Sequence, residues 1–393
     1  MMGMRGVSVA GIGETPMGRY PDRGLREMIR EAGHQAIEDS GIDAGEIDAV
    51  FVGNFAGQTL TGQGHLGPMV TETLGLTTVP AMRVEGACAS GGLALLQAVN
   101  AIRYGIHDIV LVGGVEKMTH QSTGVVTGAL TSAMDVELEA QTGQTFPGEF
   151  AMIAHRYFHE HRNIQREMAQ VAVNAHDNAL LNPHAQLHKK IDVDKVLGAP
   201  RIADPLGLFD CSLVTDGAAF LVLTADDVSD AYSTGRRHRR IRITGSGHGG
   251  DALTLQGKKS QTSFSATLQA ASTAYAQSGR GAGDIDLAEV HDCFTITQII
   301  NTEDLGFFET GRGADAVADG RTALHGDMPI NTSGGLKAKG HAVGATGISQ
   351  AIEIITQLRG AAGDRQITKA DIGLTHNLGG TAATCVINIF EGE

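Results

Sequence analysis

The sequence predicts an α/β protein made of two pseudo-symmetric halves, with an inserted subdomain in the first half. Residues 40–54 read SGIDAGEIDAVFVGN and residues 278–292 read SGRGAGDIDLAEVHD, and the two stretches align without a gap. The offset between them is 238 residues, 278 minus 40. The chain of 393 residues also exceeds the roughly 250–300 residues at which a single hydrophobic core stops growing. We therefore expect at least two core-building units that share one architecture.

Helical patterns precede both copies of the repeat. Apolar residues recur at helical spacing from Leu25 to Ala36 before the first copy and from Leu268 to Tyr275 before the second. Both patterns end at a Ser-Gly pair, and a glycine just past the end of a helix is a common C-terminal signal. Each copy then continues into a short apolar strand.

The later elements of the two halves also correspond. A helical stripe at residues 95–102 precedes the apolar run 109–112, and a stripe at 348–355 precedes the run 372–375. Each half ends with another apolar strand, DGAAFLVLTA from Asp216 and GGTAATCVINIF from Gly379. Each half therefore reads as strand, helix, strand, helix, strand, strand. Short continuous apolar strands separated by helices favour mostly parallel sheets covered on both faces.

One long interval breaks the symmetry. The last strand of the first half follows only after residues 120–215, a segment far longer than an ordinary loop. We divide the chain into four parts. The N-terminal half covers residues 1–119 and the inserted loop subdomain residues 120–215. The last strand of the first half and a linker cover residues 216–240, and the C-terminal half covers residues 241–393. Within the insertion, His155 and His159 lie four apart on a predicted helix near His161, but no HExxH motif or matching carboxylate accompanies them. We therefore expect no metal site there.

The composition indicates a globular chain and excludes several classes of function. The formal net charge of −14 argues against a general nucleic-acid binder, because such binding depends on a basic surface. A basic cluster at residues 236–242 could serve an anionic ligand, although charge runs are more often solvated linkers. No stretch approaches the roughly 20 apolar residues of a membrane span. Four scattered cysteines without a CxxC motif predict reduced thiols and a cytoplasmic protein.

Two glycine patterns resemble nucleotide-binding loops without their context. GIGETPMG at residues 11–18 has Pro16 where a Rossmann helix should begin, and it contains no GxGxxG. GSGHGG at residues 245–250 matches GxGxxG, but no amphipathic helix follows it. The motif requires a strand, a turn and a helix in succession, so we expect no nicotinamide site.

Cys88 is the first candidate for chemistry. It lies in RVEGACASGG, residues 83–92, directly before the second helical stripe of the first half. Free N–H groups at a helix N-terminus favour the thiolate over the thiol. Cysteine is only a few per cent ionised at pH 7, and a fall of about two units in its pKa would make the thiolate the major form. A nucleophile and a small core residue are equal alternatives at this position.

His341 occupies the equivalent place in the second half. It lies in the glycine-rich turn NTSGGLKAKGHAVGATG, residues 331–347, just ahead of the helical stripe that begins at Ile348. The glycines indicate close backbone approach or positive φ. If the two halves pack face to face, the pseudo-symmetry brings Cys88 and His341 toward each other.

Two further segments carry candidate residues. HNLGG at residues 376–380 follows the last parallel strand, and its Gly379 and Gly380 either supply N–H donors to an oxyanion or form a simple turn at the sheet edge. EVHDCFT places His291 and Cys293 two positions apart, on the same side of an extended segment.

Together these motifs resemble a known family. GACASGG, HDCF, NTSGGLKAKGHAVGATG and HNLGG follow one another over essentially the whole chain, and in combination they resemble a thiolase of the sterol-carrier-protein type. HDCF together with the GHxxGATG turn is highly specific. The resemblance implies a thiolase-like, five-layered αβαβα fold of two pseudo-symmetric halves with an inserted loop domain, assembled as a homodimer or homotetramer.

The resemblance also assigns roles. It implies that Cys88 is the nucleophile that becomes acylated and that His341 activates it and helps to bind the thioester oxygen. It implies that His291 replaces the asparagine of most thiolases and holds a water at the same oxyanion hole. Ordinary thiolases take their second cysteine from a Cys-x-Gly turn, which reads THNLGG here, so Cys293 is the expected acid and base. Ser212 matches a pantetheine-contacting serine, and Phe294 is the other expected substrate contact.

One residue departs from the family pattern. Ala342 stands where the family usually has proline, which puts the rate of the reaction in doubt but not the role of His341.

The function expected is that of an acyltransferase that makes or breaks 3-ketoacyl-CoA through a cysteine thioester. CoA and acyl-CoA are its substrates, and no metal or tightly bound cofactor is needed. The alternatives are acetyl transfer to a non-CoA acceptor with a small partner protein, and a non-catalytic acyl-CoA-binding or scaffolding subunit.

Overall fold

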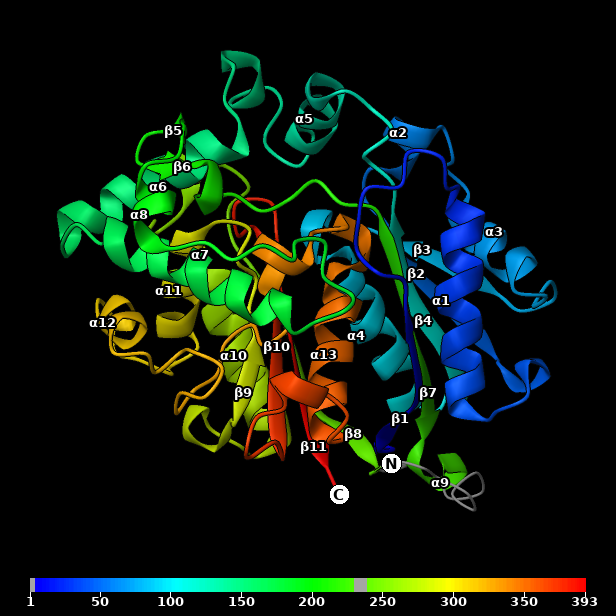
Figure 1. Ribbon diagram of the computed structural model, residues 1–393. Coiled ribbons are helices and arrows are strands. Elements are labelled where there is room, and N and C mark those ends of the chain that lie inside the picture. Colours follow the sequence, from blue (N-terminus) through cyan, green and yellow to red (C-terminus); the bar gives the residue numbers. More distant parts are fainter. Residues whose placement is uncertain (1–3, 230–238) are drawn as a thin grey trace.

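The computed structural model describes residues 4–229 and 239–393, in which two half-sheets lie side by side with helices between and around them (Figure 1). The half-sheets join into one nine-stranded sheet of order β3-β2-β4-β7-β1-β8-β11-β10-β9. A short pairing of β1 with β8, Ser8 with Arg242 and Val9 with Ile241, connects them. A small hairpin, β5 with β6, stands apart from this sheet. The strands are β1 (Val7–Glu14), β2 (Ala49–Gly53), β3 (Ala81–Val84), β4 (Ile109–Glu116), β5 (Arg201–Ala203), β6 (Leu206–Gly207), β7 (Gly217–Ala225), β8 (Ile241–Gly250), β9 (Leu287–Glu289), β10 (Ile372–Gly379) and β11 (Thr384–Gly392).

Helices form three layers around the half-sheets. Helices α1 and α3 cover the outer face of the N-terminal half-sheet, and α10 covers the outer face of β8 and β11. Helices α4 and α13 lie between the half-sheets and pack against each other. The expected αβαβα layering is therefore present. The helices are α1 (Leu25–Ser40), α2 (Gly57–Thr61), α3 (Leu66–Thr73), α4 (Ser90–Arg103), α5 (Thr123–Thr131), α6 (Phe146–Glu160), α7 (Gln165–Leu180), α8 (Val193–Leu197), α9 (Asp226–Ser229), α10 (Ser265–Ser278), α11 (Thr295–Asp304), α12 (Gly313–Ala318) and α13 (Thr346–Leu358).

The ends of the repeated helices are those that the sequence predicts. Gly41 follows α1 with a φ of 65°, and its N–H donates to the carbonyl of Glu38. Gly279 follows α10 with a φ of 68°, and its N–H donates to the carbonyl of Tyr275. Glycine adopts this left-handed conformation without a steric penalty, so both helices end at the same point of the repeat.

The prediction of mostly parallel sheets is wrong. The pairs β2–β3, β2–β4 and β9–β10 are parallel, whereas β1–β7, β4–β7, β1–β8, β8–β11 and β10–β11 are antiparallel. β11 follows β10 after a turn of four residues, and a connection this short allows only an antiparallel neighbour. Strand β3 is also missing from the predicted elements, because four residues are too few to show a periodic pattern.

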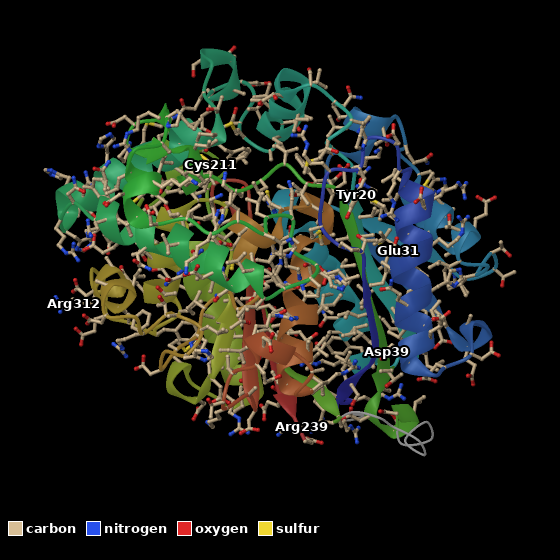
Figure 2. The ribbon with its side chains drawn as sticks, viewed as in Figure 1. Tyr20, Glu31, Asp39, Cys211, Arg239 and Arg312 are labelled. Atoms are coloured by element: carbon tan, nitrogen blue, oxygen red, sulfur yellow. The ribbon has the colours of Figure 1, made fainter. Side chains whose placement is uncertain are left out.

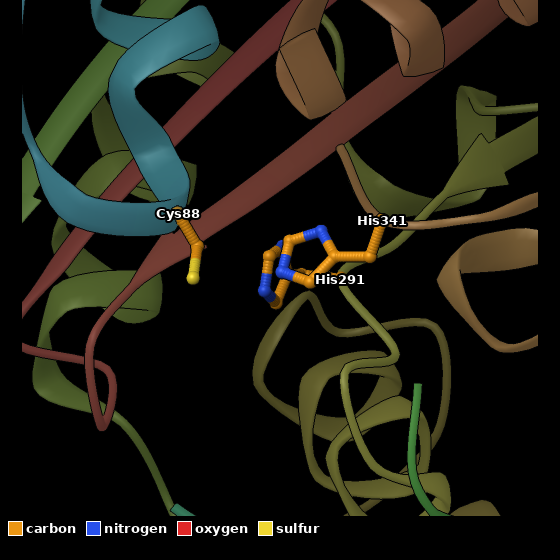
Figure 3. A group of neighbouring side chains, drawn as sticks. All are labelled: Cys88, His291 and His341. Carbon is orange, nitrogen blue, oxygen red and sulfur yellow. The ribbon is translucent and has the colours of Figure 1, made fainter. Parts of the chain in front are cut away.

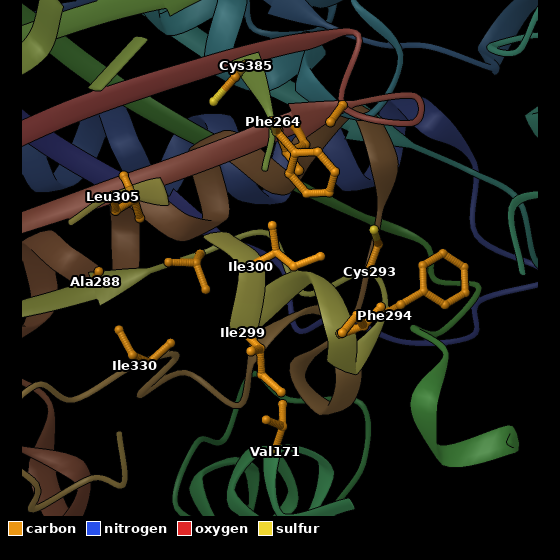
Figure 4. Close-up of a cluster of buried hydrophobic side chains, with 14 of the residues drawn as sticks. Val171, Phe264, Ala288, Cys293, Phe294, Ile299, Ile300, Leu305, Ile330 and Cys385 are labelled. Atoms are coloured by element: carbon orange, nitrogen blue, oxygen red, sulfur yellow. The ribbon is translucent and has the colours of Figure 1, made fainter. Parts of the chain in front are cut away.

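The segment between β4 and β7 packs on the C-terminal half. Phe150, Tyr157, Met168 and Val171, from α6 and α7, belong to the same buried cluster as the apolar residues of β9, β10 and α11. Figure 4 shows Val171 of this segment next to Ile299 of α11. These side chains of the segment therefore contribute to a core that it shares with the C-terminal half. The boundaries 120–215 stay a prediction.

GSGHGG is part of a strand rather than a nucleotide-binding loop. The whole motif lies within β8, where α10 crosses over its glycines. A Cβ atom on Gly247 would lie 1.9 Å from the carbonyl oxygen of Ala270, so glycine is required for the helix to approach. GIGETPMG similarly begins inside β1, and no helix follows it directly. Neither pattern has the strand-turn-helix context of a dinucleotide site.

The described part of the basic cluster lies far from the pocket described below. Arg236, Arg237 and His238 fall outside the described residues. Arg239 pairs with Asp371 at 2.8 Å, and Figure 2 shows Arg239 at the end of the molecule that holds the termini, opposite Cys211. Arg240 and Arg242 also form ion pairs, both with Asp226. A surface role suits these arginines better than a role as ligand contacts.

Two other predictions concern a histidine metal site and a membrane-spanning helix, neither of which the sequence leads us to expect. His155 lies 3.2 Å from Asp204 at an exposed position, and no group of three ligand-type side chains includes it among the residues that the structure describes. No helix in residues 4–229 or 239–393 is long and apolar enough to cross a membrane.

Candidate active site

Cys88 lies in a tight turn between β3 and α4. Residues 87–89 form a single 3₁₀ turn in which Ala87 adopts a left-handed conformation with a φ of 51°. The hydroxyl of Ser90 accepts a hydrogen bond from the Gly86 N–H at 3.0 Å and donates to the Ala87 carbonyl at 2.6 Å. Strained backbone of this kind persists only where its surroundings hold it. The turn places the half-buried Cys88 at the N-terminal end of α4, as the sequence predicts.

Burial reverses the expected ionisation of Cys88. Loss of solvation is the main cause, and with the nearby carboxylate of Glu116 it raises the pKa of the thiol to about 12. A hydrogen bond from the backbone of Gly380 favours the thiolate without outweighing burial. Burial therefore outweighs the effect of the helix N-terminus, which favours the thiolate. Cys88 is a thiol, and a base must take its proton when it reacts.

His341 provides a neutral imidazole near that thiol. It lies on the turn before α13, where its backbone N–H donates to Thr215 Oγ1 at 2.9 Å. Its Nδ1 lies 2.8 Å from Thr346 Oγ1. Burial lowers the pKa of His341 to about 3. The ring is therefore uncharged at neutral pH, which is the state that accepts a proton.

Cys88, His291 and His341 converge although they come from three separate parts of the chain. The Cys88 sulfur and one ring nitrogen of each histidine all lie within 4.8 Å of one another, and Figure 3 shows both rings beside the sulfur. The ring centroids of His291 and His341 are 5.2 Å apart and the rings are nearly perpendicular. Burial, together with His341 and His376, lowers the pKa of His291 well below its usual value. Two neutral imidazoles therefore flank one thiol.

Cys293 lines the same cavity as Cys88. It lies just before α11, and its sulfur is 4.0 Å from Thr297 Oγ1. Burial and the neighbouring Cys88 raise the pKa of Cys293 well above its ordinary value, so it too is a thiol. Cys385 is different, because it is the second residue of β11. Its side chain is fully buried, and its sulfur lies 3.8 Å from the hydroxyl of Thr267. Figure 4 shows Cys385 apart from Cys293 within the apolar cluster.

The two glycines of HNLGG have different surroundings. Gly380 adopts a φ of 59°, and its backbone forms the hydrogen bond to the Cys88 sulfur. Gly379 pairs with Thr384 in the β10–β11 ladder, and a Cβ atom on it would lie 2.3 Å from the carbonyl oxygen of Gly86. Gly380 is therefore the one that faces the sulfur, while Gly379 permits the approach of the Cys88 turn.

An apolar cavity of about 200 Å³ opens beside these groups. Cys88, Cys293 and His341 line it, together with Leu130 and Phe146 from the segment between β4 and β7. An apolar pocket with a few converging polar groups is the usual form of a small-molecule site.

Ser212 and Phe294, the two residues that the sequence predicts as substrate contacts, also line this cavity. The Phe294 ring stacks on that of Phe150 with centroids 4.6 Å apart. The backbone N–H of Ser212 donates to the carbonyl of Cys293 at 2.9 Å. This bond ties the segment that enters β7 to the turn that carries Cys293.

Sequence reasoning missed two polar residues of the site, Asn377 and Thr346. Asn377 lies in HNLGG and contacts both Cys88 and His291, while Thr346 lies in GATG and contacts His341. Each is a hydrogen-bonding side chain inside a glycine-rich turn that brings other candidates together. That setting is the signal that could have identified them.

Comparison with known proteins agrees with this geometry. The family model for the thiolase N-terminal domain matches residues 7–227, and the model for the thiolase C-terminal domain-like family matches residues 247–392. The chain belongs to the thiolase family. This thiolase is 44% identical over 388 residues to a Methanothermobacter thermautotrophicus protein named acetyl-CoA acetyltransferase, covering 99% of this chain and 100% of that one. It is 30% identical over 389 residues to human sterol carrier protein 2, covering 96% of this chain and 70% of that one.

Solved structures share the fold at low identity. The Ltp2-ChsH2(DUF35) aldolase matches with a TM-score of 0.82 at 24% identity, covering 98% of both chains. Human mitochondrial 3-ketoacyl-CoA thiolase matches with a TM-score of 0.77 at 18% identity, covering 99% of both chains. These matches establish the thiolase fold of the chain.

Proposed function

We propose that this thiolase is a CoA-dependent acyltransferase that forms or cleaves 3-ketoacyl-CoA through a thioester on Cys88. The observation that carries the proposal is the convergence of the Cys88 sulfur with the rings of His291 and His341 beside an apolar cavity that Cys293 also lines. Relatives named acetyl-CoA acetyltransferase, at 44% and 42% identity over 99% of this chain, support acyl transfer.

Cleavage begins with the Cys88 thiol and the His341 ring, both of which are uncharged. The Cys88 thiol gives its proton to His341, and the sulfur attacks the 3-keto carbon of the substrate. The protonated ring of His341 and the ring of His291, with a water that it holds, stabilise the oxyanion that forms. Neutral imidazole suits the first step, and an imidazolium N–H suits the second.

Carbon-carbon cleavage then leaves the acyl group on Cys88. The electron pair of the broken bond passes to the methylene carbon of the departing acetyl-CoA, which Cys293 protonates. A CoA thiol next gives its proton to the Cys293 thiolate and attacks the Cys88 thioester. The new acyl-CoA departs, the Cys88 thiolate takes its proton back from His341, and both cysteines and the histidine return to their starting states. Synthesis runs through the same steps in reverse.

Sulfur is well matched to this sequence of steps. A thioester on Cys88 is nearly equal in energy to a thioester of CoA, so acyl transfer is reversible. The raised pKa of Cys293 keeps it protonated until the carbanion appears. No step needs a metal or a prosthetic group. The convergence of Cys88 with His341 favours turnover over a non-catalytic scaffolding role.

An oligomeric assembly is part of the proposal. Strand β3 is an edge strand of the sheet, and Met82 on it is 56% exposed. An exposed edge with an apolar side chain is a surface suited to pairing with another chain. Because β3 leads directly into the Cys88 turn, we propose that a homodimer forms on this edge. A homotetramer and a small accessory protein stay predictions.

We propose the cellular location of the protein from the absence of disulfide bonds between its cysteines. All four cysteines are free, which favours a reducing compartment and therefore the cytoplasm.

The test is CoA-dependent cleavage of a series of 3-ketoacyl-CoA esters from acetoacetyl-CoA upward, with wild type and Cys88→Ala. We expect cleavage by the wild type and an acyl-enzyme of matching mass, both absent in Cys88→Ala. Cleavage that persists in Cys88→Ala would refute the proposed role of this cysteine.

A further inference from the structure

We propose that Asn377 is a positioning residue that fixes the ring tautomer of His291, so that this ring presents an N–H to the oxyanion hole and the water held there. The catalytic consequence rests on the proposed function, whereas the tautomer itself does not. Asn377 lies on β10 and is 1% exposed.

The amide of Asn377 is held in one orientation by three contacts. Its Oδ1 accepts a hydrogen bond from the backbone N–H of Gly92 at 3.1 Å. Its Nδ2 donates to the Cys88 carbonyl oxygen at 3.0 Å and lies 3.2 Å from His291 Nδ1. If the amide oxygen and nitrogen of Asn377 were exchanged, its NH₂ group would face the N–H of Gly92 and its oxygen would face the carbonyl oxygen of Cys88. Neither pair can form a hydrogen bond. The NH₂ group must therefore face Cys88 and His291.

This orientation decides which nitrogen of His291 carries the hydrogen. One amide hydrogen goes to the Cys88 carbonyl and the other points at His291 Nδ1, so Nδ1 must be the acceptor. The neutral ring has a single hydrogen, which is then on Nε2. Nε2 of His291 makes no hydrogen bond within residues 4–229 and 239–393. It is therefore free to donate to a ligand.

The facing ring of His341 has the opposite arrangement. The hydroxyl of Thr346 donates to the Ala342 carbonyl at 3.1 Å, so it can only accept from His341 Nδ1 at 2.8 Å. His341 therefore carries its hydrogen on Nδ1 and a lone pair on Nε2. One ring of the pair is a base and the other is a donor, and a different neighbouring side chain sets each.

The other hydrogen bonds that the structure describes for His291 involve only its backbone. Its N–H donates to His376 Nδ1 at 3.3 Å, and its carbonyl accepts from Asn301 at 3.0 Å and from Thr297 at 3.0 Å. Asn377 is the hydrogen-bond partner of the ring itself among the described residues. A change at Asn377 should therefore alter the ring while these backbone contacts remain.

The first test is the tautomer of His291 in the intact protein. Protein labelled with ¹⁵N-histidine allows NMR to distinguish protonated from unprotonated ring nitrogens, and a His291→Gln variant identifies the signals. We expect hydrogen on Nε2 in the wild type. In Asn377→Asp the carboxylate can only accept, so the hydrogen should move to Nδ1. A wild-type spectrum with hydrogen on Nδ1 would overturn the proposal even if the variant failed to fold.

The second test is the pH profile, with Asn301→Asp as a matched control. Asn301 is buried and contacts the same histidine through its carbonyl, so Asn301→Asp adds a similar carboxylate without touching the ring. Losing one oxyanion donor costs about 10²- to 10³-fold in kcat. We expect a loss of this size in Asn377→Asp at high pH that shrinks as pH falls, because imidazolium regains the Nε2 hydrogen.

The outcomes separate this proposal from the proposed function. A loss in Asn377→Asp that is independent of pH and equal to that in Asn301→Asp would leave Asn377 a merely structural residue. A protein that cleaves no 3-ketoacyl-CoA but shows the tautomer change would refute the function and retain the positioning role.

Discussion

Gly92 and Gly347 lie so close together that a Cβ atom on Gly347 would fall 2.3 Å from the backbone nitrogen of Gly92. They occupy the first turns of α4 and α13, the helices related by the internal repeat. A Cβ atom on Gly91 would similarly lie 2.8 Å from the carbonyl oxygen of Gly344. The two helix N-termini therefore meet backbone to backbone, and this contact brings Cys88 and His341 to one point.

Gly347→Ala should damage the site more than the fold. Its methyl group meets backbone that cannot rotate away, so α4 and α13 must separate, at a cost of about 1–3 kcal/mol in unfolding free energy. A displacement of about 1 Å between catalytic groups can lower activity about 10²-fold. Urea denaturation and kcat/KM for 3-ketoacyl-CoA cleavage measure the two effects. Gly24→Ala, where a Cβ meets nothing within 4 Å, is the control. Wild-type kcat/KM in Gly347→Ala would contradict this interpretation.

Cys293→Ala should separate the two chemical roles of sulfur. We expect it still to acylate Cys88, because a CoA thiolate leaves without much help from an acid. Removing a proton from the methyl group of acetyl-CoA needs a positioned base, worth typically 10² to 10⁴ in rate. Mass spectrometry of the acyl-enzyme and NMR of hydrogen-deuterium exchange measure the two steps. Cys385→Ala, in the apolar core, is the matched cysteine control, and wild-type exchange in Cys293→Ala would point to another base, with His341 first.

Thr346→Val should slow proton transfer from Cys88 while Thr346→Ser should not. Valine has the shape of threonine but cannot accept from His341 Nδ1, so the ring loses the contact that keeps Nε2 unprotonated. We expect kcat to fall about 10- to 100-fold, within the usual range for general base catalysis. The loss of one hydrogen bond should cost about 1 kcal/mol of stability. Equal rates for the valine and serine variants would show that the hydroxyl has no part in setting the ring.

Glu149→Gln should change how stability depends on pH. Glu149 lies on α6, and its carboxyl group accepts a hydrogen bond from Thr381, next to Gly380. Burial raises its pKa from 4.5 to about 7. Between pH 4.5 and about 7, Glu149 therefore keeps its proton in the folded state and loses it in the unfolded state. The contribution of Glu149 to stability is complete below pH 4.5 and disappears as pH rises to about 7.

Glutamine removes this dependence because it stays neutral. From pH 4.5 to 7.5 the unfolding free energy of Glu149→Gln should rise relative to wild type by on the order of 3 kcal/mol. Urea denaturation at several pH values measures the difference, with Glu38→Gln at an exposed position of α1 as the control. Parallel pH curves for Glu149→Gln and wild type would show that Glu149 is charged in the fold.

The internal repeat determined much of the architecture from sequence. Residues 40–54 and 278–292 revealed two similar halves, and the Ser-Gly pairs located the ends of α1 and α10 because glycine at a helix end is a local requirement. The prediction of mostly parallel sheets was wrong, because five of the eight strand pairs that the structure describes in the nine-stranded sheet are antiparallel. Whether β11 pairs parallel or antiparallel with β8 depends on how the chain returns in space, which residue spacing does not contain.

The sequence by itself determined which residue types stand at the ends of the repeated elements: a cysteine before α4, a histidine before α13, and a second cysteine in HDCF. Only the tertiary structure decided their state. Burial leaves Cys88 a thiol despite its place at a helix N-terminus, because desolvation is a property of the whole surroundings and not of neighbours in the chain. The contacts of Asn377 and Thr346 likewise arise where separate turns meet, so the tautomers of His291 and His341 follow from packing alone.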